Sequence, residues 1–153
     1  MPLLTVSHHR QRQQADCLAA CAAMVLDFLQ LSIGYEQLLR LLGIRYFGAP
    51  FSSLRKLGSL GVTVLIARGD LATLRGYLEE GYPVIVAVNT LALPYWNEDT
   101  AHALVVVGFE HDAVLLNDPE FVRVPQTVST DLFLLAWLEQ DYRYAVIKLA
   151  GAA

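Results

Sequence analysis

The chain has 153 residues, of which 55% are hydrophobic and 17% are charged, which suits one domain with a sizeable core and excludes a mainly disordered protein. Its formal net charge is −4, and its largest basic cluster is the pair Arg55-Lys56. Nucleic acid and anionic membranes are therefore excluded as expected partners, because both attract proteins through clustered positive charge.

The first half of the chain is predicted to be mainly helical. Residues 17–30 are apolar on nearly every side, which is typical of a helix that the rest of the domain encloses. Asp27 interrupts this stretch before the roughly 20 apolar residues that a membrane span needs, so no transmembrane helix is expected. Cap, stop and β-branched residues then predict helices at residues 35–42, 52–59 and 70–80, and a strand at 62–66.

The second half changes to strands, which apolar runs predict at residues 83–88, 103–108, 113–116 and 144–149. Residues 102–109 and 113–117 are expected to pair as an antiparallel hairpin, and Thr130-Asp131 is expected to cap a helix at 132–139. Residues 89–101 form the one long loop between these elements, and such loops are often functional. Helices packed on an antiparallel sheet define an α+β fold, in a single domain over residues 1–153.

The N-terminus lacks the basic start and long apolar run of a secretion signal, so we expect a cytoplasmic protein. Cys17 and Cys21 lie four residues apart on one predicted helix, where a disulfide is geometrically unfavourable. A cytoplasmic setting would also keep them reduced, and both are predicted to be free thiols.

Cys17 stands where a polar loop ends and the buried helix begins. A thiol at this place feels the positive end of the helix dipole, which favours the nucleophilic thiolate. The structural alternative is that Cys17 packs as a small buried hydrophobe, the role we expect for Cys21. Gln11, six residues upstream, could aim its amide N–H groups at an oxyanion beside the sulfur, with Gln13 and Gln14 as rivals.

His102 follows the long loop and begins a very apolar strand. It is a candidate for the general base that deprotonates a thiol and then protonates a leaving amine. A histidine that merely satisfies its hydrogen bonds at the sheet edge is the alternative. Asp118 closes the next strand of the hairpin, where it could orient His102, although Asn117-Asp118-Pro119 is also an ordinary turn sequence.

A zinc site is the competing interpretation of the cysteines. Cys17 and Cys21 share a helix face and could join His8 or His9. The spacing is not that of established zinc fingers, so we expect no metal and no cofactor.

These motifs together resemble the papain-like bacteriocin-processing cysteine peptidases, which occur as stand-alone domains and within peptide-exporting ABC transporters. That family begins with a glutamine, four variable residues and Asp-Cys-Gly-x-Ala-x, which Gln11, Asp16 and Cys17 fit, with Ala19 or Ala20 and Cys21. Its later motifs are Gly-x-Pro-Val-Ile, a histidine before a valine-rich strand that ends in Gly-Phe/Tyr, and Asn-Asp-Pro. Residues 81–85, 102–109 and 117–119 match them in order, so the resemblance spans about residues 9–149.

The resemblance implies a papain-like fold in which a nucleophile helix packs on the antiparallel sheet. It assigns Cys17 as the nucleophile, His102 as the base, Asp118 as the orienting acid and Gln11 as the oxyanion donor. The expected substrate is a peptide or protein, and a double-glycine leader peptide is what the family suggests. Because no transporter segment follows, we expect a free-standing relative, and its oligomeric state is open.

Leu18 stands where the family usually has glycine, so its side chain is expected near the approaching substrate. Tyr95, Trp96 and Ala101, on the long loop and at its end, are the other predicted substrate-binding residues, although loop aromatics often only anchor the loop. Two alternative functions stay open at this point. One is an inactive peptide-binding module on the same fold, and the other is a transamidase or acyltransferase that uses the same triad.

Overall fold

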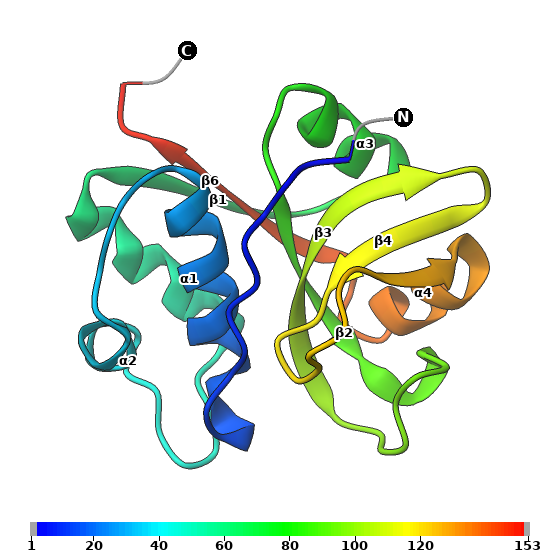
Figure 1. Cartoon of the computed structure of the whole chain (residues 1–153), viewed down its shortest axis with the longest axis horizontal. Coiled ribbons are helices and arrows are strands. Elements are labelled where there is room, and N and C mark those ends of the chain that lie inside the picture. Colours follow the sequence, from blue (N-terminus) through cyan, green and yellow to red (C-terminus); the bar gives the residue numbers. More distant parts are fainter. Residues whose placement is uncertain (1–2, 152–153) are drawn as a thin grey trace.

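The computed structural model describes residues 3–151, which form helices on both faces of one antiparallel sheet (Figure 1). The helices and 3₁₀ segments are η1 (Gln14–Asp16), α1 (Cys17–Phe28), α2 (Tyr35–Leu42), η2 (Phe51–Leu60), α3 (Leu71–Glu79), η3 (Thr90–Ala92) and α4 (Thr130–Leu138). The strands are β1 (Val62–Arg68), β2 (Val84–Asn89), β3 (Ala101–Glu110), β4 (Ala113–Asn117), β5 (Gln126–Ser129) and β6 (Arg143–Leu149). The sheet order is β1-β6-β2-β3-β4-β5, and the predicted α+β class is confirmed.

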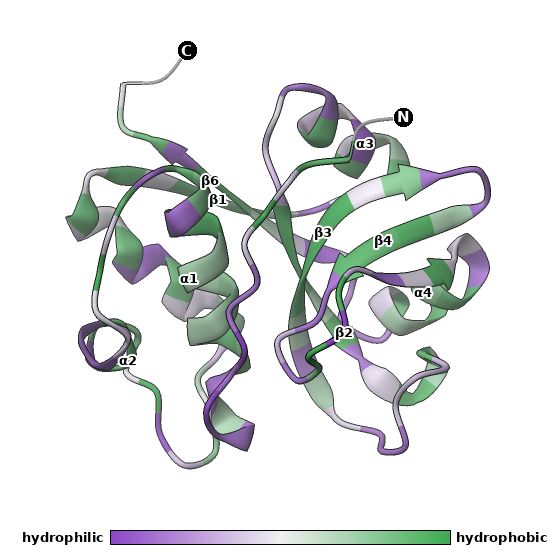
Figure 2. Cartoon of the chain, in the orientation of Figure 1, coloured by the Kyte–Doolittle hydropathy of each residue, from purple (hydrophilic) through white to green (hydrophobic). Residues whose placement is uncertain are grey.

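The sheet separates two apolar cores. Because successive side chains of a strand point to opposite faces, Ile85 and Ala87 of β2 pack with α1, α2 and η2, whereas Val84 and Val86 pack with α3 and α4. The central strands β2 and β3 are buried along nearly their whole length, and Figure 2 shows them as the most continuously hydrophobic part of the chain. This central position gives the residues at the strand ends a rigid support.

The enclosed helix predicted at residues 17–30 is confirmed as α1, which ends two residues early, at Phe28. Gln30 has a positive φ of 63°, which is not helical, so the chain leaves the helix there. Eight residues of α1 are buried, in accordance with its nearly uniform apolar composition. Cys17 is its first residue and stands at the end of the helix that points towards β3 (Figure 1).

The predicted hairpin is confirmed as β3 and β4, which pair antiparallel with Val105 opposite Asn117. A bulge between Val106 and Gly108 shifts the register further along. Extended by one residue, the pairing places Asp118 opposite Leu104, so Asp118 is a diagonal neighbour of His102 on the same face.

The prediction missed β5, a four-residue edge strand that pairs with β4. Its residues are mostly polar, so no apolar run marks it. The predicted cap of the last helix was also wrong by one position, since Ser129 caps α4 and its hydroxyl accepts a hydrogen bond from the Leu132 N–H at 3.3 Å.

The N-terminal segment connects the two halves of the molecule. It runs between α1 and the hairpin before it enters α1 (Figure 1). The N–H of Leu4 donates to the carbonyl of Val107 at 2.8 Å, and the Asn117 amide donates to the carbonyl of Val6 at 3.1 Å. The N–H of Gln11 then donates to the carbonyl of Pro119 at 2.9 Å. These bonds hold the start of α1 beside the segment that carries Asp118.

No helix within residues 3–151 is both long and apolar enough to span a lipid bilayer.

Candidate active site

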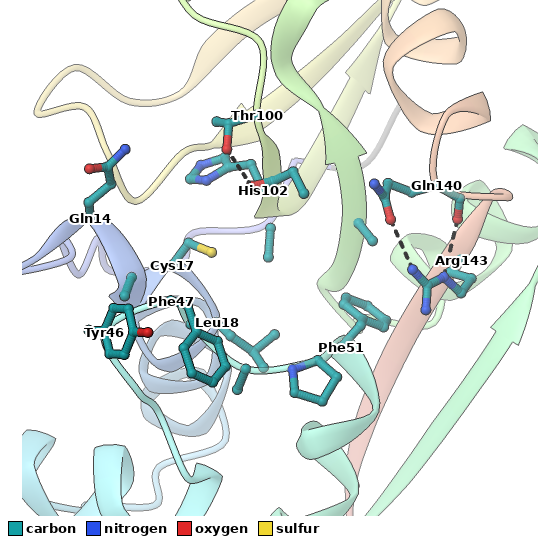
Figure 3. A pocket seen from close by; sticks show the side chains of 17 residues that line it. Gln14, Cys17, Leu18, Tyr46, Phe47, Phe51, Thr100, His102, Gln140 and Arg143 are labelled. Carbon is teal, nitrogen blue, oxygen red and sulfur yellow. Dashed lines mark hydrogen bonds between the residues drawn. The ribbon is translucent and has the colours of Figure 1, made fainter.

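A cleft of about 430 Å³ opens between the helices and the sheet, and both Cys17 and His102 line it (Figure 3). We call its two sides the helical wall and the sheet wall. The helical wall consists of Gln14, Ala15, Cys17, Leu18 and residues 46–51. The sheet wall consists of Ala87, Thr100, Ala101, His102, Ala103, Gln140 and Arg143. The cleft therefore joins segments from the start, middle and end of the chain.

The two cysteines of α1 have opposite environments, and neither forms a disulfide. Cys17 is partly exposed in the cleft, at the first position of the helix. Cys21 is fully buried, and this burial raises the pKa of its thiol well above the ordinary value. A thiol held neutral and out of contact with solvent cannot act as a nucleophile. Cys17 is therefore the candidate, as the sequence predicts.

His102 begins the buried part of β3, opposite Val88 of β2. Its Nε2 lies 2.8 Å from Oδ1 of Asp118, and only 7% of its surface is exposed. With Nε2–H donating to the carboxylate, Nδ1 is the ring nitrogen that remains available to Cys17. The Trp96 indole and the imidazole pack in an edge contact, at 4.8 Å between ring centroids. These contacts fix both the tautomer and the orientation of the ring.

Asp118 is fully buried and accepts four hydrogen bonds. Its Oδ1 accepts from His102 and, at 3.0 Å, from the backbone N–H of Glu120. Its Oδ2 accepts from the Tyr95 hydroxyl and from the Trp96 indole N–H, each at 2.8 Å. A buried carboxylate is expensive unless its oxygens are paired, and here both are.

Tyr95 and Trp96 thus have a different place from the predicted one. Their polar atoms point to Asp118, and neither residue lines the cleft beside Cys17. Trp96 instead lines a second hollow of about 450 Å³, which shares the lining residues Gln14, Thr100, Ala101 and His102 with the cleft. Both aromatic rings also contact Phe121, at 5.1 and 5.2 Å between centroids. The long loop therefore closes over the carboxylate. The sequence does not predict this, because the residues next to Tyr95 and Trp96 in the chain do not indicate which distant acceptor these side chains will meet.

The electrostatics favour a charged imidazole. Burial lowers the pKa of His102, but the hydrogen bond and charge of Asp118, together with the neighbouring Cys17 sulfur, outweigh burial and raise this pKa to about 9. Burial would likewise raise the pKa of Asp118, yet His102 and the N–H groups of Trp96 and Glu120 hold it below its ordinary value. These pKa shifts favour a charged carboxylate on Asp118 and a charged imidazolium on His102 at neutral pH.

Gln11 is buried close to the start of α1, but its amide is occupied in this conformation. Nε2 donates to the carbonyls of Gln13 and Gln14, at 3.1 Å each, and Oε1 is buried without a hydrogen-bond partner among residues 3–151. Gln11 therefore pins the turn that leads into Cys17, and an N–H group directed at an oxyanion would require the amide to rotate. Gln14, the rival in the sequence, lines the cleft with an exposed side chain.

Leu18 and Ala101, which are predicted substrate-binding residues, both line the cleft. Leu18 is only 3% exposed and belongs to the core packed around α1. The side chain expected to project towards the substrate therefore forms part of the cleft floor and does not obstruct it (Figure 3).

Sequence reasoning missed several residues that line the cleft. Tyr46 and Phe47 are 92% and 69% exposed at its rim, with their rings in an edge contact. Gln140 and Arg143 lie across the cleft from Cys17 (Figure 3). In the sequence these four residues look like ordinary turn residues. The only indication of a binding surface was that two aromatic residues, Tyr46 and Phe47, stand side by side in a predicted loop.

The zinc alternative has no geometric support. His8 binds the carbonyl of Phe121 at 2.7 Å, and His9 lies 3.3 Å from the carboxylate of Asp27. Across residues 3–151, no three cysteine, histidine or acidic side chains gather in a way that could hold a metal ion.

Comparison with known proteins gives one family. The model of the Peptidase C39 family matches residues 5–140. Among curated proteins, none matches the chain.

Solved structures resemble the protein over nearly its whole length. A C39-like protein from Bacillus anthracis has a TM-score of 0.80 at 15% identity and covers 97% of this chain and 98% of its own. A double glycine motif protease from an AMS/PCAT transporter, in complex with the leader peptide, has a TM-score of 0.77 at 19% identity, with coverage of 97% and 95%. The peptidase domain of Streptococcus ComA, a bifunctional ABC transporter of a quorum-sensing pathway, has a TM-score of 0.75 at 21% identity, with coverage of 97% and 100%. At these identities the likeness establishes the fold, which is the expected papain-like one.

Proposed function

The chain belongs to the peptidase C39 family and is a cysteine-type peptidase, and we propose that it hydrolyses peptide bonds through the triad Cys17, His102 and Asp118. The observation that carries this proposal is the buried hydrogen bond of 2.8 Å between His102 and Asp118, in a cleft that also exposes Cys17. A thiolate paired with an oriented imidazolium is the arrangement that nucleophilic catalysis by cysteine requires.

In the acylation step, the Cys17 sulfur attacks the carbonyl carbon of the scissile bond and the carbonyl oxygen becomes an oxyanion. The backbone N–H of Cys17 and, after rotation of its amide, Gln11 would stabilise this oxyanion. The proton on His102 passes to the leaving nitrogen as the C–N bond breaks, which releases an amine and leaves a thioester on Cys17.

In the deacylation step, His102 is neutral and accepts a proton from water as the water oxygen attacks the thioester carbon. The C–S bond then breaks, which releases a carboxylic acid and returns the Cys17 thiolate beside a protonated His102. Asp118 keeps the imidazole in one orientation through both steps and stabilises its charged form.

The substrate class that we propose is a peptide, with leader-peptide processing as its most specific form. The protease that holds a leader peptide, and that shares this fold, is a double glycine motif protease. A peptide with a double-glycine motif is therefore the first substrate to test.

The test incubates the protein with double-glycine leader peptides and with a mixed peptide library in water enriched in ¹⁸O, and mass spectrometry follows the products. Cleavage with one ¹⁸O in each new carboxylate, and none by Cys17→Ala, is expected. A Cys21→Ala variant serves as the matched control and should cleave normally. If Cys17→Ala cleaves as fast as the wild type, the proposed function is wrong.

The same experiment separates hydrolysis from the alternatives. A transamidase or acyltransferase would give products joined to an added amine, without ¹⁸O. An inactive binding module would retain peptides without cleaving them.

A further inference from the structure

Apart from the proposed ion pair of Cys17 and His102, Arg143 is the only charged residue among those of residues 3–151 that line the cleft. It is the first residue of β6 and lies on the sheet wall, opposite Cys17 (Figure 3). The second hollow, by contrast, is lined by charges of both signs, Arg10, Arg12, Glu98 and Glu120. An unbalanced positive charge is thus a property of the active-site cleft.

The guanidinium of Arg143 is held in place by neutral groups. Nη2 donates to Oε1 of Gln140 at 2.9 Å, and Nε donates to the carbonyl of Gln140 at 3.3 Å. The Gln140 amide is itself fixed, because its Nε2 donates to Oδ1 of Asn89 at 2.6 Å. The backbone is fixed as well, since the Trp137 indole donates to the Arg143 carbonyl at 2.8 Å. Arg143 is therefore oriented before any ligand binds.

No carboxylate of residues 3–151 lies within 4.0 Å of the Arg143 guanidinium. Its directly opposite neighbour on β1 is Arg68, which supplies no countercharge and is not among the residues that line the cleft. Gln140 satisfies hydrogen bonds but supplies no negative charge. Two of the five N–H groups of Arg143 are used by Gln140, which leaves the others for a ligand.

We propose that Arg143 binds a carboxylate of the peptide that occupies the cleft and so selects the substrate. A planar guanidinium with free N–H groups can donate two parallel hydrogen bonds to one carboxylate. The carboxylate of the ligand would also supply the negative charge that the cleft lacks. The inference rests on the proposed function, because it assumes that the cleft between Cys17 and Arg143 holds the substrate. The carboxylate has two possible sources, an Asp or Glu side chain or the C-terminal carboxylate of the peptide.

The test uses two libraries of short random peptides with acetylated N-termini, one with free and one with amidated C-termini. The wild type, Arg143→Gln and the matched control Arg68→Gln digest each library, and mass spectrometry reads the residues around each cleaved bond. The same three proteins, each also carrying Cys17→Ala, are then tested for retention of peptides from the libraries. Protection of the buried Cys21 from alkylation by iodoacetamide checks that each variant is folded.

We expect Asp and Glu to be enriched at one position of the peptides that the wild type and Arg68→Gln cleave and retain. Arg143→Gln should lose this preference by about tenfold to a hundredfold, the usual effect of losing a charge-assisted pair. Arg143→Glu should prefer Lys and Arg at the same position. If the ligand is the C-terminal carboxylate, Arg143 dependence will appear only with free C-termini, and amidated peptides will be poor substrates.

Identical profiles for the wild type and Arg143→Gln would overturn the carboxylate site, while continued Cys17-dependent cleavage would leave the proposed function intact. Conversely, suppose that acidic peptides are retained in an Arg143-dependent way while none of the proteins cleaves any peptide. That result would support the carboxylate site and show that the proposed function is wrong.

Discussion

The two walls of the cleft hold their reactive groups by different means. On the helical wall, Cys17 is placed by backbone and apolar packing, since it begins a helix whose following residues are buried. On the sheet wall, His102 is placed by side-chain hydrogen bonds that converge on Asp118, behind the wall. The position of Cys17 thus depends on the fold as a whole, whereas the orientation of His102 depends on one carboxylate.

The largest expected effect comes from the helical wall. Cys17→Ser should abolish peptide hydrolysis, with a fall in kcat on the order of 10⁵–10⁶, because removal of a nucleophile removes the covalent route. Cys21→Ser is the matched control on the same helix, and it should keep kcat within a fewfold while it lowers the melting temperature, because a polar hydroxyl would replace a buried thiol. Steady-state kinetics and thermal unfolding measure both. Equal loss of activity in both variants would show that the effect is structural.

The next effect tests the sheet wall. Asp118→Asn keeps the shape of the carboxylate but can accept hydrogen bonds with one oxygen only, which leaves donors among Tyr95, Trp96 and Glu120 without a partner. Activity should fall by roughly 10³–10⁴-fold, the scale of acid-to-amide changes in such triads, and the free energy of unfolding by about 2–4 kcal/mol. Peptide kinetics and urea unfolding measure the two losses. An active, fully stable Asp118→Asn protein would contradict the role given to this network.

Variants of Gln11 and Gln14 test which of these two glutamines stabilises the oxyanion. Gln11→Ala should lower kcat by about 10²–10³-fold, as expected for loss of an oxyanion donor, and should also loosen the turn before Cys17. Gln14→Ala should change kcat by only a fewfold, since this side chain is exposed. Kinetics of the two single variants decide the matter, and the reverse order of effects would transfer the oxyanion role to Gln14.

The smallest effect concerns one hydrogen bond behind the sheet wall. Tyr95→Phe keeps the ring against Phe121 and removes only the hydroxyl that donates to Asp118. The free energy of unfolding should fall by about 1–2 kcal/mol, with a modest loss of kcat. Tyr46→Phe, at a tyrosine that is 92% exposed, is the control and should leave unfolding in urea unchanged. Equal stability of the two variants would mean that the hydroxyl of Tyr95 does not support the carboxylate.

The helical wall was easier to predict from the sequence than the sheet wall. Cys17 could be placed because a local rule, a polar loop before an apolar run, marks the start of an enclosed helix. The pairing of His102 with Asp118 could be expected because a short turn connects their strands. These cases depend on neighbours in the chain.

The missed features depend on contacts between distant segments. The sequence predicts Tyr95 and Trp96 in the cleft, but both donate to Asp118 instead, because a buried carboxylate is stable only when its oxygens accept hydrogen bonds. Arg143 begins the last strand, and only the folding of β6 beside β2 brings it into the cleft. No local pattern distinguishes such a residue from an arginine in a solvent-exposed turn.

The charged pair of His102 and Asp118, on the side of the sheet wall, makes the stability of the protein depend on pH with a definite sign. Because the pKa of His102 in the folded protein is raised from 6.5 to about 9, its charged form stabilises the protein fully below pH 6.5, and this contribution is lost as the pH rises through about 9. Asp118 has a lowered pKa, so its contribution is present above about pH 4 and is lost at more acidic pH. The charged pair therefore exists across the neutral range.

The most direct test of the central claim is the rate at which iodoacetamide alkylates each cysteine at pH 6, read by peptide mass spectrometry. A thiolate held by the imidazolium of His102 should make Cys17 react much faster than the buried Cys21, and His102→Ala should greatly slow the labelling of Cys17 in a protein that is still folded. Equally slow labelling of both cysteines in the wild type, or fast labelling of Cys17 that survives His102→Ala, would contradict a catalytic pair across the cleft.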